Sequence, residues 1–254
     1  MQALKKNRKI ALVSGGMGYV GKAVTQRFAQ DGISVVVMYH TSSQESVDEF
    51  LMLLGEGHAA YQCDLGNEAQ MQETIATIER EQGPVSIYVH AAGASPSRKP
   101  LHLTSTEEVL EAFKKNALSG FNFFTAGATY LKERKEGVMI GITTAAVVFP
   151  QSVGSLGPYV AAKYALQGML ASFRAELLPF GIRVYSVAPG FMEGGMNSVF
   201  PKAFVEMVKA KSPTKMLATA ENIAEHISFL VSDAGKDFTD LTIVVAPELE
   251  VHAL

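Results

Sequence analysis

The stretch IALVSGGMGYVG, residues 10–21, decides the fold of this chain. Residues 10–13 have the apolar character of a buried strand, the next residues form a glycine-rich turn, and a helical pattern follows. Glycines allow unusual backbone angles and a close approach to a pyrophosphate, and a helix N-terminus presents free N–H groups to an anion. The stretch therefore predicts a phosphate-binding strand–turn–helix unit. Taken alone, it could also be an ordinary tight turn.

The same alternation of apolar runs and helical patterns continues along the chain. Continuous apolar runs suit strands buried on both faces, and helices between them make neighbouring strands parallel. Strands are expected over residues 10–13, 34–38, 59–63, 85–89, 138–142, 184–188 and 241–245, and helices over 20–30, 44–54, 68–81, 106–133, 159–178 and 220–231. The sequence thus predicts an α/β fold: a single doubly wound Rossmann domain over residues 1–254, with a parallel seven-stranded sheet and helices on both faces. Residues 191–213 have no strand pattern and are expected to form a substrate lid.

Composition narrows the classes of function. Hydrophobic residues make up 48% of the 254 residues and charged residues 19%, which excludes a disordered chain. A net charge of −3 provides no basic field for nucleic acid. No apolar run reaches the roughly 18 residues that span a bilayer, and the single cysteine, Cys63, favours a reducing compartment. We therefore expect a soluble cytoplasmic protein with no nucleic-acid or membrane partner. The histidines have no i, i+4 pair, so no metal site is expected.

Tyr159 and Lys163 stand four residues apart in the stretch YVAAK and so share one face of a helix. Tyrosine titrates near pH 10, and a neighbouring ammonium group stabilises the phenolate and lowers that pKa. The pair predicts a general acid for carbonyl reduction and a base for the reverse reaction. Elsewhere such a pair would be an ordinary surface contact, but its position after the fifth strand of this pattern favours catalysis.

The end of the second strand bears on the choice of cofactor. Proteins that prefer NAD place an acidic side chain there, on the adenosine ribose. Here the strand ends in Tyr39, His40 and Thr41, and residues 38–43 contain no carboxylate that would repel a 2′-phosphate. NADP (NADPH) is therefore favoured over NAD. The candidate phosphate partners are His40, Thr41, Ser42 and Lys22, although His40 could also be a solvated loop residue.

In their order along the chain, these motifs resemble those of the short-chain dehydrogenase/reductase family. Residues 14–21 are similar to the family's Thr-Gly-x-x-x-Gly-x-Gly turn, with Ser14 in place of threonine and Tyr19 in place of the middle glycine. The resemblance is strongest to ketoreductases that act on 3-oxoacyl thioesters of acyl carrier protein or CoA. It implies that the turn binds the cofactor through Ser14, Gly15, Met17, Gly18, Tyr19 and Val20.

Other strand ends fit the resemblance, with departures. Residues 89–93, VHAAG, are similar to the family's Asn-Asn-Ala-Gly, so support for this turn must come from His90 or be absent. Residues 183–190 are similar to the sixth strand and nicotinamide loop, but Tyr185 replaces the usual asparagine and Gly194 the usual threonine. Residues 246–248 lack the usual Asp-Gly-Gly. The further cofactor contacts implied are Asp64, Leu65, Ala91, Ala92, Gly93, Pro189, Gly190 and Met192, with an N-cap neighbour as the other interpretation of Asp64.

The resemblance also implies a catalytic group around Tyr159 and Lys163, both of which would touch the cofactor. Thr144 stands where the family has a serine that binds the substrate carbonyl, and the adjacent Thr143 is an alternative. Less favoured alternatives are Ser152 and Ser155. Asn116 matches a helix asparagine whose backbone carbonyl holds a water linked to the lysine.

The expected function is the reduction of a ketone or aldehyde by an NADP(H)-dependent oxidoreductase, with Tyr159 as general acid. A 3-oxoacyl thioester is one candidate substrate, and a homo-oligomer, dimer or tetramer, is the expected assembly. The departures at Tyr19, His90 and Gly194 leave open a catalytically silent nucleotide-binding sensor or assembly subunit. An NAD-linked alcohol dehydrogenase is the other alternative.

Overall fold

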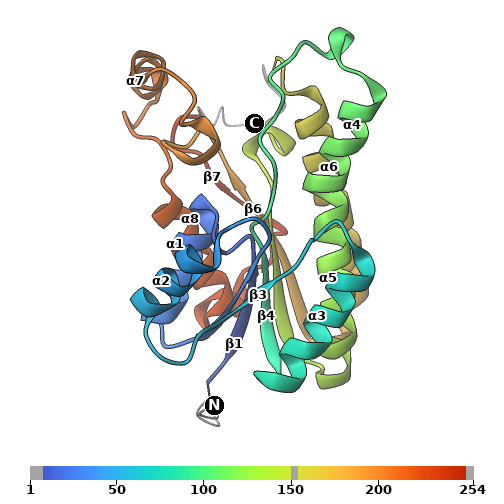
Figure 1. The fold of residues 1–254 in the computed structure, drawn as a ribbon. Helices are drawn as coiled ribbons and strands as arrows, with labels where there is room; N and C mark the ends of the chain where they lie inside the picture. The colour runs from blue at the N-terminus through green and yellow to red at the C-terminus, as the bar shows by residue number, and fades with distance from the viewer. Residues whose placement is uncertain (1–7, 150–153, 250–254) are drawn as a thin grey trace.

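One parallel sheet organises the computed structural model, which describes residues 8–149 and 154–249 (Figure 1). Its seven strands follow the order β3-β2-β1-β4-β5-β6-β7. Their bounds are β1 Ile10–Ser14, β2 Ser34–Tyr39, β3 Ala59–Gln62, β4 Val85–His90, β5 Gly137–Ile142, β6 Ile182–Pro189 and β7 Thr242–Val245. The strand order reverses between β1 and β4. In such sheets ligands bind beyond the carboxyl ends of the strands at this reversal.

Helices cover both faces of the sheet. The helices are α1 Tyr19–Gln30, α2 Gln44–Leu54, α3 Glu68–Glu81, α4 Thr106–Phe113, α5 Ser119–Arg134, α6 Gly157–Leu177, α7 Lys202–Lys211 and α8 Ala220–Val231. Successive strand side chains point to opposite faces, so Val13 joins a core with α1, α2 and α8, whereas Leu12 joins a core with α3, α5 and α6. The predicted doubly wound parallel fold is therefore confirmed.

The helix expected over residues 106–133 is not regular. It is divided into α4 and α5 by a π-helical turn, Lys114–Leu118. The side chain of Asn116 leaves this turn to accept a hydrogen bond from the backbone N–H of Ala94 and to donate one to the carbonyl of Ala112. Such turns often mark functional sites, and this one faces the end of β4.

The segment after β6 stands above the carboxyl edge of the sheet. It contains a short 3₁₀ turn, Gly195–Asn197, and α7, which the strand and helix patterns did not predict. In Figure 1, α7 and α4 rise on opposite sides of this edge. Within residues 8–149 and 154–249, no helix is long and apolar enough to cross a membrane.

Candidate active site

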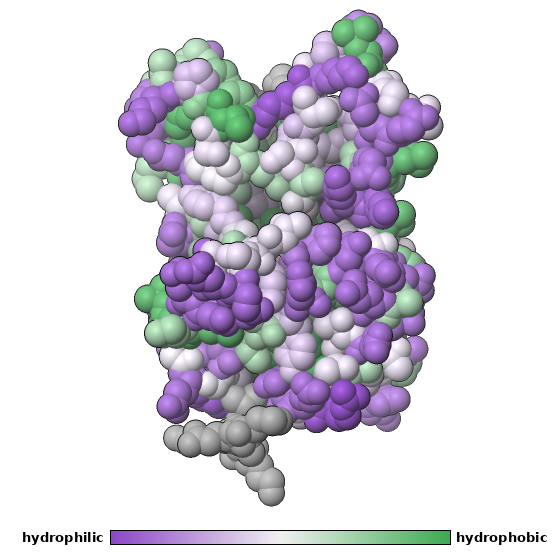
Figure 2. All heavy atoms as spheres, in the orientation of Figure 1, coloured by the Kyte–Doolittle hydropathy of each residue, from purple (hydrophilic) through white to green (hydrophobic). Residues whose placement is uncertain are grey.

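The carboxyl ends of β1, β4, β5 and β6 meet at one crevice. The surface is hollowed between the part that carries α7 and the part that carries α4 (Figure 2). On the α4 side a cavity of about 320 Å³ is bounded by the loop after β4, by α4 and by the start of α6, and its wall includes Asn116 and Tyr159. Of the predicted catalytic residues, Asn116 and Tyr159 line this cavity.

The glycine-rich turn has the geometry of an anion cradle. Gly15 adopts a φ of +66°, and a Cβ there would lie 2.6 Å from the Cα of Ala92. A Cβ on Gly21 would lie 2.1 Å from the carbonyl oxygen of Gly15. Only glycine fits at these two positions. Among the residues that the structure describes, no side chain caps the N-terminus of α1, which begins at Tyr19 after Gly18. Its first N–H groups and its dipole are therefore left for an anion, as phosphate binding requires.

Tyr19 departs from the glycine expected at this point of the turn and reaches across the crevice. Its hydroxyl donates a hydrogen bond to the carbonyl oxygen of Glu193, 2.6 Å away, in the loop after β6. The side chain is 43% exposed. Two sides of the candidate cofactor site are therefore joined by one side chain.

Lys163 is buried beneath the end of β5, where its Nζ donates to the carbonyl oxygen of Ile142 at 2.8 Å. The Nζ lies 5.8 Å from the centre of the Tyr159 ring. Burial lowers the pKa of Lys163 to about 8 and raises the pKa of Tyr159 to about 12. The expectation that the ammonium would lower the tyrosine pKa is therefore wrong for this arrangement, because desolvation of the phenol raises that pKa. Tyr159 is protonated at neutral pH.

The two threonines at the end of β5 have different surroundings. Thr143 is buried, and its hydroxyl lies 2.8 Å from the hydroxyl of Ser186 on β6. Thr144 has an extended backbone and is half-buried, and its hydroxyl has no hydrogen-bond partner among the described residues. Of the alternatives, Ser155 is exposed with a φ of +63°, whereas Ser152 lies outside the described residues. Thr144 is thus the threonine at this strand end whose hydroxyl has no partner among residues 8–149 and 154–249.

Asn116, Gly93 and Lys163 come together at the end of β4. A Cβ on Gly93 would lie 2.9 Å from the Oδ1 of Asn116 and 3.6 Å from the Nζ of Lys163. Asn116 is buried, and its side chain holds the loop after Gly93 through the N–H of Ala94. The small residue at position 93 therefore lets the lysine and the asparagine approach each other.

The turn at residues 89–93 has His90 where the family pattern Asn-Asn-Ala-Gly has its first asparagine, and His90 supports this turn. Its Nδ1 lies 2.7 Å from the hydroxyl of Ser14, at the end of β1, and its Nε2 lies 3.4 Å from the hydroxyl of Ser119 on α5. The ring is fully buried. Burial, and then the charge of Lys163, lower the pKa of His90 to about 3. A neutral imidazole thus ties the glycine-rich turn to α5.

The adenine end of the expected cofactor site is more open. His40 and Thr41 are exposed after β2, whereas Tyr39 is buried and its hydroxyl donates to Gln44 at 2.9 Å. Asp64 accepts a hydrogen bond from the N–H of Gly66 at 2.9 Å, so its carboxylate shapes the turn before α3. The half-buried Leu65 follows it. Lys22 lies over the ring of Phe50, 5.3 Å from its centre.

The loop after β6 is held by a residue that the sequence analysis missed. Pro189 ends β6, and the N–H of Phe191 donates to the carboxylate of Glu248. A Cβ on Gly190 would collide with that carboxylate, and burial raises the pKa of Glu248. Met192, next along the loop, has its carbonyl bound by Asn197 at 2.9 Å. The sequence did offer a signal for this residue: where the family pattern has Asp-Gly-Gly, residues 246–248 end in Glu248, which puts a carboxylate in place of a glycine.

Arg98 was also missed. Its guanidinium lies 4.1 Å from the centre of the Phe200 ring and donates to the carbonyl oxygen of Met196 at 2.9 Å. The loop after β4 is thereby joined to the segment before α7. No local pattern marked this arginine, because its partners are a ring and a carbonyl group about a hundred residues away in the sequence.

Within the part of the chain that the structure describes, no cluster of histidine, cysteine, aspartate and glutamate could hold a metal ion. The crevice instead combines an anion cradle with a protonated tyrosine, a buried lysine and a free hydroxyl. The fold and these groups together define a dinucleotide-binding oxidoreductase.

Comparison with known proteins agrees with this class. Residues 18–246 match a family model described as enoyl-(acyl carrier protein) reductase. A 3alpha-hydroxysteroid dehydrogenase of Mediterraneibacter gnavus is 31% identical over 236 residues, 91% of this chain and 92% of that protein. The 3-oxoacyl-[acyl-carrier-protein] reductase FabG of Thermotoga maritima is 28% identical over 242 residues, 92% of this chain and 95% of that protein. A crystallised actinorhodin polyketide ketoreductase with NADPH has a TM-score of 0.87 at 22% identity, covering 96% of this chain and 98% of that chain.

The chain belongs to the short-chain dehydrogenase/reductase family. It is an NAD(P)-dependent oxidoreductase of that family, whose members act on small molecules.

The buried His90 gives a test of this geometry through pH. The pKa of His90 is about 3 when folded and 6.5 when unfolded, so between these values only the unfolded chain binds the proton. Stability is therefore lost as pH falls below about 6.5, with a limiting slope of about 1.4 kcal/mol per pH unit from this residue. His90→Asn should remove that contribution. We expect urea unfolding at pH 7, 6 and 5 to show a shallower loss in the variant, and parallel losses would contradict the assignment.

Proposed function

We propose that this enzyme reduces a ketone or aldehyde with NADPH, and that Tyr159 is its general acid. The observation that carries the proposal is a tyrosine whose pKa is raised to about 12, placed beside a buried lysine at the carboxyl edge of the sheet. A phenol that keeps its proton at neutral pH can donate it to a carbonyl oxygen that is becoming an alkoxide. The uncapped N-terminus of α1 and the tight glycine contacts fit a pyrophosphate.

Each residue of the candidate catalytic group has a separate role in this proposal. Tyr159 donates its proton to the carbonyl oxygen, and the free hydroxyl of Thr144 donates a hydrogen bond to the same oxygen. Lys163, charged below its pKa of about 8, stabilises the phenolate that remains and binds the nicotinamide ribose. Asn116 holds the loop after β4 in place through Ala94. A bound nicotinamide would supply the hydride.

The preference for NADPH rests on the end of β2. His40 and Thr41 are exposed there, and residues 38–43 contain no carboxylate. A 2′-phosphate would therefore meet no negative charge from this segment, and His40, Thr41, Ser42 and Lys22 are the groups that could bind it. Asp64 and Leu65 would lie against the adenine.

A substrate with an acyl chain, such as a 3-oxoacyl thioester, suits the lining of the crevice. The exposed or half-buried Met196, Phe200 and Phe204 present apolar surface in the segment after β6. The methyl group of Met196 would lie 3.8 Å from a Cβ on Gly93. We propose that residues 191–213 act as the substrate lid of a single cytoplasmic catalytic domain.

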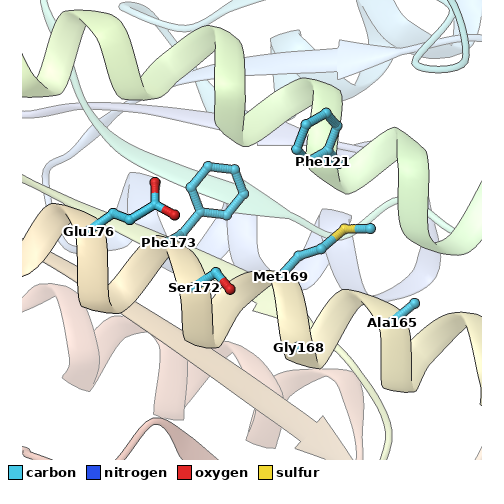
Figure 3. A pocket seen from close by; sticks show the side chains of 7 residues that line it. All are labelled: Phe121, Ala165, Gly168, Met169, Ser172, Phe173 and Glu176. Atoms are coloured by element: carbon cyan, nitrogen blue, oxygen red, sulfur yellow. The ribbon is translucent and has the colours of Figure 1, made fainter.

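The outer face of α5 and α6 suits a second copy of this chain. A hollow of about 470 Å³ lies there, lined by Phe121, Ala165, Gly168, Met169, Ser172, Phe173 and Glu176 (Figure 3). Small residues on α6 allow another helix to approach closely, and the two phenylalanines offer apolar surface. Since Glu176 is the one charged residue of this lining, we propose that two copies pair here in a homodimer or homotetramer.

The catalytic role of Tyr159 can be tested with a panel of carbonyl substrates that includes 3-oxoacyl thioesters. Tyr159→Phe should lower kcat by about 10²- to 10⁴-fold, because the general acid is lost, while the Kd for NADPH stays within about threefold. Tyr61→Phe, on the distant strand β3, is the matched control and should retain activity. Turnover that survives Tyr159→Phe would refute the mechanism. Tight NADPH binding by the wild type without turnover of any substrate would favour the silent sensor.

The cofactor preference can be tested by fluorescence titration. The wild type should bind NADPH at least about tenfold more tightly than NADH, a difference of about 1.4 kcal/mol. His40→Asp should remove that preference, because the carboxylate repels a 2′-phosphate. His226→Asp, which places the same charge on the half-buried position 226 of α8, should leave it unchanged. Equal affinities in the wild type would instead favour the NAD-linked alcohol dehydrogenase.

The proposed pairing face can be tested at Gly168. A Cβ at this position meets no atom within 4 Å of the same chain, so Gly168→Glu should fold normally and yet block the approach of a second helix. Analytical ultracentrifugation should then show a smaller assembly than the wild type at the same concentration. Gln72→Glu, on the exposed side of α3, should behave as wild type. A monomeric wild type would contradict this proposal.

A further inference from the structure

The ring of Tyr19 packs closely against two glycines in the loop on the opposite side of the crevice. A Cβ on Gly195 would lie 2.7 Å from the Cδ1 of Tyr19, and a Cβ on Gly194 would lie 3.0 Å from its Cζ. Both glycines have positive φ, +95° at Gly194 and +57° at Gly195. The large side chain at position 19 and the missing side chains at 194 and 195 are therefore complementary, and Tyr19 and Gly194 both depart from the family pattern.

The contact spans the crevice at a defined place. Tyr19 is the first residue of α1, whose uncapped N-terminus is the anion cradle. Glu193, which accepts its hydrogen bond, lies just beyond Gly190 and Met192 in the loop that follows β6. A dinucleotide with its pyrophosphate on α1 and its nicotinamide beside that loop would have to run between these two walls. The side chain of Tyr19 is the group that joins them.

The loop is also held from its other side. Arg98 donates to the carbonyl oxygen of Met196, only a few residues from Glu193. Burial and the charge of Glu221 raise the pKa of Tyr19, so its hydroxyl remains a donor over the physiological range. Residues 193–196 are thus fixed by a tyrosine on the cofactor side and by an arginine on the substrate side.

We propose that Tyr19 is a clamp on the bound dinucleotide: its bridge to Glu193 closes the crevice over the pyrophosphate, and the cofactor leaves only when this bridge opens. This inference rests on the proposed function. Tyr19 is a positioning residue in this role, because it acts through the loop and not on the reacting atoms. Its signature is a slow release of cofactor rather than a loss of chemistry.

The release rate of NADPH provides the test. In stopped-flow displacement of fluorescent NADPH from the purified full-length chain, Tyr19→Phe should release the cofactor about 5- to 10-fold faster, because one hydrogen bond is lost. Tyr19→Gly, which installs the family's residue, removes the ring as well and should increase the rate by about 10- to 100-fold. Gly195→Ala should also accelerate release, because its methyl group displaces the ring from the opposite side. Tyr61→Phe, outside the crevice, should leave the rate unchanged.

Hydrogen exchange of the same variants separates a clamp from a purely structural contact. Residues 193–197 should exchange faster in Tyr19→Gly, whereas the melting temperature should change little because the side chain is partly exposed. Release from Tyr19→Gly within twofold of wild type, in a folded variant, would overturn the clamp and leave the proposed function standing. Slower release or tighter binding in that variant would also overturn it, by showing that the ring obstructs the cofactor. A wild type that binds neither NADPH nor NADH would overturn both.

Discussion

The burial of Lys163 is the constraint around which the site is built. An ammonium group in the protein interior loses its hydration, and its burial is tolerated only where polar partners replace that water. Here the carbonyl oxygen of Ile142 at the end of β5 is such a partner, 2.8 Å away. The same charge helps to keep His90 neutral, and Gly93 leaves the room in which the lysine and Asn116 approach each other. Lys163 on α6 therefore links the carboxyl ends of β4 and β5 to the π-helical turn.

The departures from the family pattern are accompanied by complementary neighbours. His90 has hydroxyl partners at Ser14 and Ser119. Tyr19 faces a pair of glycines, and Glu248 lies against Gly190, where any side chain would collide with it. In each case a larger or more polar side chain has a site shaped to receive it. The walls of the crevice therefore remain well packed, although these substitutions change how the loop after β6 is held.

Much of the fold could be predicted, because the periodicity of apolar residues and the glycines that end helices are local properties of the sequence. Strand and helix positions followed from apolar runs and glycine stops, and their alternation implied the parallel sheet. The π-helical turn could not be predicted in this way, since it is stabilised by Asn116 reaching a loop that follows β4. The pKa of Tyr159 was predicted in the wrong direction. Spacing showed that a lysine would be near, but it could not show that the phenol would be desolvated, and desolvation is what raises its pKa.

By itself, the sequence determined the class of fold, the glycine-rich turn, and the presence of a tyrosine and a lysine on one helix face. These features depend on residues within a few positions of each other. Only the tertiary structure decided which threonine hydroxyl is free, that Glu248 and Arg98 hold the loop after β6, and that Tyr19 crosses to Glu193, 174 residues away in the chain. Such contacts have no local periodicity. They exist because the parallel sheet brings the ends of distant strands to one edge, where packing and desolvation, rather than spacing along the chain, decide which groups meet.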